Sequence, residues 1–374
     1  MILTRGARIT GAVLCAVLAA LVAAWIVRDL RAVGDPSTLL RYWAGYTDGW
    51  PRKLPATLQA DPVLLVVYVL ALLAALRSSV AASALVVTGL VTLVLRLPGL
   101  WIIGSSWTGD RFGDDLRTRA LVGTFVTLAA GLALVVTGAA GRRRPEDMYE
   151  RPPTRPGRGA GVTAFLMLGA SGAVLIAWEI RQLFTLPDEV YPAWYIGGEA
   201  LTLGLIAAPP GWSSVALGVI CLVVAWTALF RAVHSRPLGM TAAGFLLVSG
   251  VCGIARTVHN GWLEHFGEAE TEQQLGMLTS LLLAFAGATA LLVLAPRGLE
   301  SAGGPDQGYG GHGHPQGGAE AYGDPRGATP GYGYPGAGTP GHGYPGVGTP
   351  GYGYPQSGGG SGSPPPPASP PPGW

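Results

Sequence analysis

The residues of this sequence that could carry polar chemistry are arginines placed next to tryptophans at the ends of apolar runs. Arg28 follows Trp25 by three residues, and Arg181 follows Trp178 by three residues. Three residues is about one helical turn, so each tryptophan and its arginine share a helix face. An arginine held in this way is suited to binding a ligand.

Two later runs end in the reverse order, with Arg96 before Trp101 and Arg256 before Trp262. We therefore hypothesise that four arginines and two acids converge on the outer face of the protein and form a polar vestibule. The six residues of this hypothesis are Arg28, Arg181, Arg96, Arg256, Asp114 and Glu268. The alternative is that the tryptophans form an aromatic belt at the membrane surface while the arginines extend their charged ends toward water.

Other candidate residues are few. Glu179 lies close to Arg181 near the end of an apolar run, where we expect it to be solvated or paired. His259 and His265, with Glu264, share one loop, but a zinc site needs three or four ligands at defined spacings. The sequence contains no nucleophile elbow, phosphate-binding loop or kinase signature. We therefore expect a protein that is not an enzyme, with no catalytic residue, metal or cofactor.

Membrane helices must position these residues. Hydrophobic residues make up 49% of the chain and charged residues only 12%, whereas a soluble domain carries about 25% charged residues. Runs long enough to cross a bilayer form helices, because lipid offers the backbone no hydrogen bonds. About eight such runs are predicted, at Ile9–Val27, Pro62–Leu76, Ala81–Ile103, Ala120–Ala140, Val162–Ile180, Trp212–Phe230, Leu238–Ala255 and Leu275–Ala295.

Charge between the runs predicts the orientation. The loop after the fourth run begins with Arg142, Arg143 and Arg144, and loops rich in arginine stay in the cytoplasm. With an even number of spans, both termini then lie in the cytoplasm. The predicted location is the cell membrane, with the lipid bilayer as one partner and no nucleic acid. A single lysine, Lys53, among many arginines indicates a GC-rich, bacterial genome.

The two halves of the apolar region resemble each other. Residues 24–30 read AWIVRDL and residues 177–183 read AWEIRQL. Ordered matches follow, pairing Trp43 with Trp194, Arg77 with Arg231, and residues 112–114 with residues 266–268. The sequence thus predicts an all-α membrane protein built by tandem duplication of a four-helix unit, with units at residues 1–141 and 161–297, a basic linker at 142–160 and a tail at 298–374.

The tail changes in composition. It is rich in Gly, Pro and Tyr and contains decapeptide copies that begin at Thr329, Thr339 and Thr349. Few apolar side chains remain to offset the entropy of ordering, so we expect a disordered cytoplasmic segment. Its proline runs could dock into an aromatic groove, or its tyrosines could act as weak multivalent contacts. The tyrosines are Tyr332, Tyr334, Tyr344, Tyr352 and Tyr354.

Two functions follow as expectations. The first is a non-enzymatic membrane protein whose tail recruits or clusters a cytoplasmic protein. The second is a transporter or channel, with a pathway between the two four-helix halves and an arginine-lined outer vestibule. A polar cavity between the halves would favour transport, and a sealed apolar seam would favour scaffolding. The sequence does not determine the oligomeric state.

Overall fold

The computed structural model describes residues 2–46, 48, 51, 53–143, 155–199, 201 and 204–296. This part is mainly helical, and its two strands, β1 (Ile2–Leu3) and β2 (Arg142–Arg143), form one short antiparallel pair. The long helices are α1 (Arg5–Val33), α3 (Ala60–Arg77), α4 (Ala81–Arg96), α7 (Asp114–Ala140), α8 (Arg158–Thr185), α10 (Pro210–Leu229), α11 (Ser235–His259) and α12 (Thr271–Leu294). The short helices are α2 (Pro36–Ala44), α5 (Gly99–Ile102), α6 (Ser106–Gly109) and α9 (Val190–Ile196).

Within the described residues, eight helical segments are long and apolar enough to cross a membrane, each coinciding with one predicted run. The third, Ala81–Ile102, consists of α4 and α5 with a break at Leu97 and Pro98. Proline explains the break, because its ring removes one backbone donor and clashes with the preceding turn. The predictions of an all-helical fold and of eight candidate membrane spans are confirmed for the described residues, and these spans suggest a multi-pass membrane protein. Several helices extend beyond the predicted runs into polar sequence, as α7 does at Asp114.

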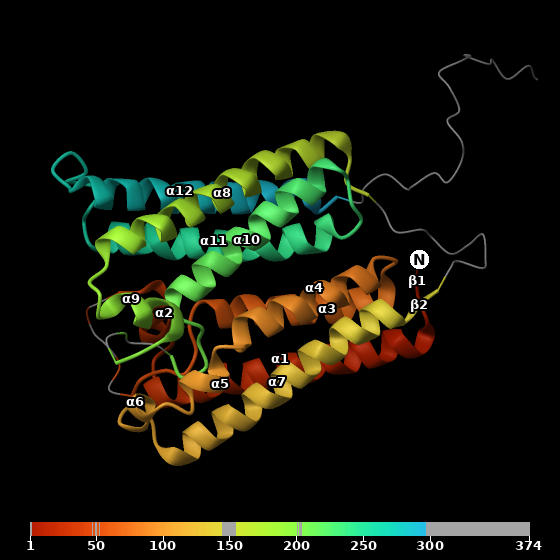
Figure 1. Cartoon of the computed structure of the whole chain (residues 1–374), viewed down its shortest axis with the longest axis horizontal. Coiled ribbons are helices and arrows are strands. Elements are labelled where there is room, and N and C mark those ends of the chain that lie inside the picture. Colours follow the sequence, from red (N-terminus) through yellow and green to blue (C-terminus); the bar gives the residue numbers. More distant parts are fainter. Residues whose placement is uncertain are drawn as a thin grey trace, which may run out of the picture. The chain divides into compact units, whose positions relative to one another are not determined.

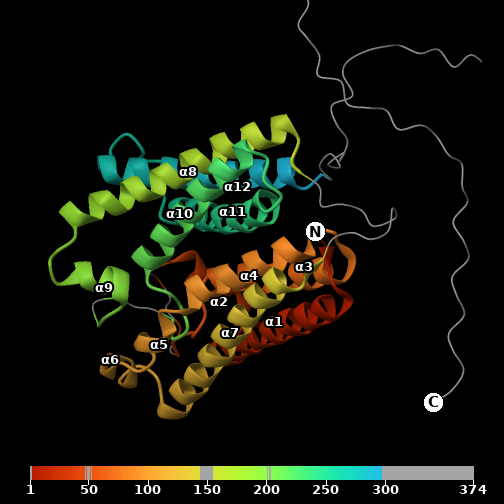
Figure 2. The ribbon, with the colours of Figure 1, turned by 45° about the vertical axis from the view of Figure 1, so that its right-hand side comes forward.

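The long helices form two groups of four, which Figures 1 and 2 show as separate bundles. In the first group, α1 packs most extensively against α3, and α4 against α7. In the second group, α8 packs against α10, and α11 against α12, in the same order along the chain. The similar order is compatible with duplication of a four-helix unit, which stays a prediction.

Glycine allows the closest helix pairs to form. A Cβ built on Gly287 of α12 would meet backbone atoms of α11, namely the nitrogen of Leu247 at 2.6 Å and the oxygen of Ala243 at 2.7 Å. A Cβ on Gly172 of α8 would meet the backbone oxygen of Gly218 on α10 at 2.8 Å. Lipid tails are as apolar as the helices, so close packing between small residues holds membrane helices together.

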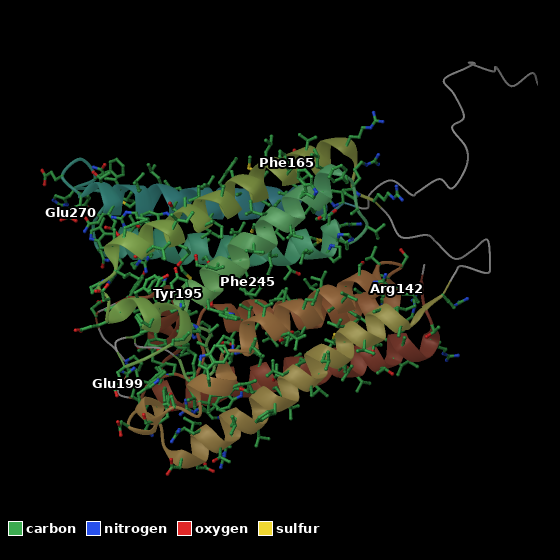
Figure 3. All side chains as sticks on the ribbon, in the orientation of Figure 1. Arg142, Phe165, Tyr195, Glu199, Phe245 and Glu270 are labelled. Carbon is green, nitrogen blue, oxygen red and sulfur yellow. The ribbon has the colours of Figure 1, made fainter. Side chains whose placement is uncertain are left out.

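The short helices gather at one end of the two groups, and β1 and β2 lie at the other (Figure 1). We call these the short-helix end and the terminal end. Asp35 begins α2 as its N-cap, accepting hydrogen bonds from the backbone of Ser37 and Thr38. These bonds and those from the two hydroxyls lower the pKa of Asp35 to about 2. The labelled residues Tyr195 and Glu199 lie at the short-helix end, and Arg142 lies at the terminal end (Figure 3).

One segment of the second group enters the first. Residues 197–209 connect α9 to α10, and Leu205 and Ile206 are buried in a cluster with Ala56, Ile103 and Phe112. The backbone of Ile206 donates to the oxygen of Ala56 at 3.2 Å. Trp212 of α10 also donates from its indole nitrogen to the oxygen of Val94 on α4 at 2.8 Å. These contacts join the groups near the short-helix end.

Three predicted features lie outside the described residues. They are the central part of the basic linker (residues 144–154), the tail with all five of its candidate tyrosines, and Arg297 at the end of the predicted second unit. The described part of the linker includes β2, and α8 begins at Arg158, three residues before the predicted start of the second unit.

Candidate functional site

Arg28 and Arg181, the two arginines that follow tryptophans, each form an ion pair at the short-helix end. Arg28 pairs with its neighbour Asp29 at 2.6 Å, and Arg181 pairs with Glu272 of α12 at 2.8 Å. The guanidinium of Arg181 also lies 5.5 Å from the centre of the Trp178 ring, within the range of a cation–π contact. The sharing of one helix face by Trp178 and Arg181 is therefore confirmed.

Arg96 is placed differently from the other predicted arginines, because it is buried. It forms an ion pair with Asp61, at the start of α3, and both side chains are almost fully enclosed, at 7% and 2% exposed. The second terminal nitrogen of Arg96 donates to the backbone oxygen of Ile206 at 2.8 Å. The other carboxylate oxygen of Asp61 accepts from the backbone of Leu58 at 2.8 Å. Two α-helices and the connecting segment of the second group thus meet at one buried pair.

The remaining members of the predicted vestibule are exposed. Asp114 pairs with Arg117, one turn along α7, at 3.3 Å. Arg256 is exposed on α11, with its guanidinium beside Gly45, and Glu268 is exposed in the loop before α12. Four of the six residues therefore have ion-pair partners outside the predicted set, and the described contacts do not join the six in one network. Convergence on a vestibule stays a hypothesis without support from these contacts.

A cavity of about 300 Å³ lies between the two helix groups. Its walls come from the start of α3 and the end of α4 on one side, and from α10 and α11 on the other. Phe245 of α11, labelled in Figure 3, lines this cavity and also belongs to the hydrophobic cluster of the first group. Cavities of this size and mainly apolar lining are typical of small-molecule sites.

The polar groups of the cavity are few, and its two charged residues lie at one end. Asp61 and Arg96 are the charged residues among its described lining, and the pair lies where α3 begins and α4 ends. Uncharged hydrogen-bonding groups come from Gln59, Ser213, Ser214, Ser249 and Thr241, of which the Thr241 hydroxyl donates to the Pro237 oxygen of its own helix. Leu217, Ile220, Phe245 and other apolar side chains line the rest. The cavity is therefore amphipathic. It matches neither of the two arrangements expected from the sequence, a polar vestibule or a sealed apolar seam.

Glu179 is the centre of a second polar network. It is 7% exposed and accepts hydrogen bonds from Trp194 and Tyr195 of α9, each at 3.0 Å. The sequence led us to expect Glu179 to be solvated or paired; it is buried rather than solvated, and its partners are the Trp194 and Tyr195 side chains of α9. Burial, together with the neighbouring carboxylate, raises the pKa of Tyr195 to about 12, so the phenol stays a donor.

We expect Glu179→Leu to destabilise the protein more than Glu272→Gln does. Leucine leaves the half-buried Trp194 and Tyr195 donors without their acceptor, and an unsatisfied group costs up to about 1–3 kcal/mol when it is buried. Glu272 belongs to an exposed pair, and such pairs contribute about 0–1 kcal/mol. Thermal unfolding of the purified full chain in detergent measures the loss of stability in each variant. Equal losses would show that the Glu179 network contributes no more than a surface pair.

A related network joins α1 to the segment before α3. Asp29 is fully buried, and one of its oxygens accepts from the backbone and the hydroxyl of Thr57 at 2.8 and 2.6 Å. Trp43 of α2 donates to the same Thr57 hydroxyl at 3.3 Å. Trp43 and Trp194 occupy equivalent positions in the predicted repeat. Trp43 is connected to the buried carboxylate of Asp29 on α1 through Thr57. Trp194 donates directly to the buried carboxylate of Glu179 on α8.

His259 joins the two groups at the short-helix end. Its ring is 2.8 Å from a carboxylate oxygen of Asp48 and stacks on Tyr46, with 4.0 Å between the ring centres. The hydrogen bond from His259 lowers the pKa of Asp48. His265 contacts the backbone oxygen of Gly261. No group of three or more His, Cys, Asp or Glu residues that could hold a metal occurs in the part of the chain that the structure describes.

Comparisons with models of protein families, with curated proteins and with solved structures find no match for this chain. The candidate site therefore rests on geometry. The sequence identified Arg96 but missed its partner Asp61, which lies at the edge of an apolar run and 35 residues away along the chain. An acid beside a predicted membrane run, with an arginine at the far end of the next run, is the signal that could have suggested the pair.

Proposed function

We propose that this chain is a multi-pass membrane protein that binds a small, mainly apolar molecule between its two four-helix groups, as the binding step of a transporter. The observation that supports this proposal is the cavity of about 300 Å³ with the buried Arg96–Asp61 pair at one end. Transport sites often lie between the repeated halves of a transporter, and ionisable residues inside membrane proteins often mark them.

The two helix groups also contact each other through residues near the cavity. The contacts between them concentrate near the short-helix end, through Arg96 and Ile206, Trp212 and Val94, and the Arg111 bonds to Glu199 and Leu201. Arg96 takes part in both the cavity wall and these contacts. Occupation of the cavity could therefore alter how the groups are held together.

Filling the cavity tests the proposal. We expect the full chain, released gently from detergent into a mass spectrometer, to carry a bound small molecule. Ala216→Phe is expected to reduce the bound fraction about tenfold or more, since Ala216 lines the cavity and a ring there would take up space that the ligand needs. Ala20→Phe, on an exposed face of α1, is the matched control. Equal retention by the wild type, Ala216→Phe and Ala20→Phe would refute a site in this cavity.

We also propose an orientation in which the terminal end faces the cytoplasm of the cell. The described residues at that end include many arginines, which favour the cytoplasmic side. They are Arg5, Arg8, Arg77, Arg142, Arg143, Arg155, Arg158, Arg231 and Arg236. Both termini, and with them the tail, would then be cytoplasmic.

The second candidate function is recruitment or clustering of a cytoplasmic protein by the tail. The repeated Tyr/Pro/Gly decapeptides and the proline runs favour it. A pull-down of the full chain beside a chain truncated at Gly298 tests this candidate. Identical sets of captured proteins would refute recruitment, and they would leave the cavity proposal unaffected.

A further inference from the structure

The charges in the cavity between the helix groups leave no unpaired cation or anion for a ligand. Asp61 and Arg96 neutralise each other, and each has a further backbone partner, Leu58 for the carboxylate and Ile206 for the guanidinium. No other charged residue lines the described walls. A ligand that carried a net charge into this space would be buried without a counter-ion, which is strongly unfavourable.

The uncharged polar side chains of the cavity have hydrogen-bonding groups to spare. Serine and threonine inside membrane helices usually bond to a carbonyl one turn back, and Ser171, Ser280 and Thr241 do so at 2.8 to 2.9 Å. Ser213, Ser214 and Ser249 differ. Within the described residues no hydrogen bond engages their hydroxyls, and none engages the Gln59 amide, although all four residues line the cavity and are half-buried.

Three of these four hydrogen-bonding residues lie toward one end of the cavity. Gln59 precedes the first turn of α3, and Ser213 and Ser214 lie in the first turns of α10, so these three lie toward the short-helix end. The α10 wall continues from Pro210 to Ile220, a distance of about 15 Å along the helix. Beyond the serines it is apolar, and Ala242 and Phe245 of α11 continue the apolar surface.

From these observations, and building on the proposed function, we infer that the ligand is a single-chain amphiphile with an uncharged, hydrogen-bonding head group. The head group is hydroxyl-like or amide-like and bonds to the side chains of Gln59, Ser213, Ser214 and Ser249. The apolar chain extends along α10 and α11 toward the terminal end. The Arg96–Asp61 pair closes the head-group end as an internal, neutral unit and does not bind a charged head.

Photolabelling of the full chain in lipid nanodiscs tests this inference. Three probes share one long alkyl chain with a diazirine in it and differ only in the head group: an alcohol, the matching fatty acid at a pH where it is ionised, and the matching quaternary amine. Mass spectrometry maps the labelled peptides. We expect the alcohol to label the cavity residues of α10 and α11, and the two charged probes to label them about tenfold less or weaker still, because their heads would be buried unpaired.

Variants separate the head-group inference from the binding site itself. Ser214→Ala combined with Ser249→Ala removes two hydroxyls and is expected to weaken cavity labelling by the alcohol several-fold, whereas Ala20→Phe leaves it unchanged. Cavity labelling by the acid or the amine that equals that by the alcohol would overturn the uncharged head group and leave the proposed site intact. If none of the three probes labels the cavity of the wild type more strongly than that of Ala216→Phe, the proposed function is overturned as well.

Discussion

Replacing either member of the buried Arg96–Asp61 pair is expected to lower the free energy of unfolding by about 3–5 kcal/mol, because the remaining charge is left buried and unpaired. Both side chains are almost inaccessible, and the helices around them are apolar. Arg96→Met also removes the donor to the backbone oxygen of Ile206, so we expect it to cost more than Asp61→Leu. Reversible unfolding of the purified full chain in mixed micelles measures the difference.

The double variant identifies the cause of this loss. Asp61→Leu combined with Arg96→Met removes both charges and is expected to recover most of the stability lost by the single variants, since buried ion pairs contribute little net stability beyond an apolar replacement. The exposed pair Asp115–Arg119 on α7 serves as the control, and Arg119→Met is expected to change stability by no more than about 1 kcal/mol. A double variant as unstable as the sum of the two singles would contradict the charge argument.

Gly287→Ala is expected to separate α11 from α12 and to destabilise the second helix group by about 1–3 kcal/mol or more. The added Cβ would lie within 3 Å of three backbone atoms of α11, and backbone atoms in two packed helices cannot move aside as a side-chain tip can. Gly250, across the same interface, has equally close backbone neighbours in Ala284. The same unfolding measurement applies.

Gly276 provides a matched control in the same helix. A Cβ there would meet no atom within 4 Å. Gly276→Ala is therefore expected to be neutral or to stabilise α12 by about 0.5–1 kcal/mol, because alanine loses less conformational freedom in a helix than glycine. Opposite signs for the two substitutions would support close packing as the cause. A similar loss for both would indicate that the glycine contacts between α11 and α12 are unimportant.

The positions of the helices can be predicted from the sequence because helix formation in lipid depends on the local run of residues. An apolar run must satisfy its own backbone hydrogen bonds in lipid, so run length alone predicts the spans. The break seen near Pro98 likewise has a local cause, the proline itself. Side-chain pairs at short spacing also follow, as the contact between Trp178 and Arg181 shows. The match between residues 24–30 and 177–183 predicts duplication, and the similar packing order of the two helix groups is compatible with it.

Only the tertiary structure shows which residues distant in the sequence contact each other. The contact of Arg96 with Asp61 and Ile206, and of Glu179 with α9, depends on which helices pack together and how far each is rotated. Many pairings of apolar helices satisfy the same hydrophobic pattern in lipid, where small residues and polar contacts select among them. The sequence alone therefore predicted about eight apolar helices with polar residues at their ends, and eight candidate spans are present in the described part of the chain. The tertiary structure decided that one arginine turns inward, pairs with Asp61 and borders a cavity between the two groups, because that position requires three separate segments to meet.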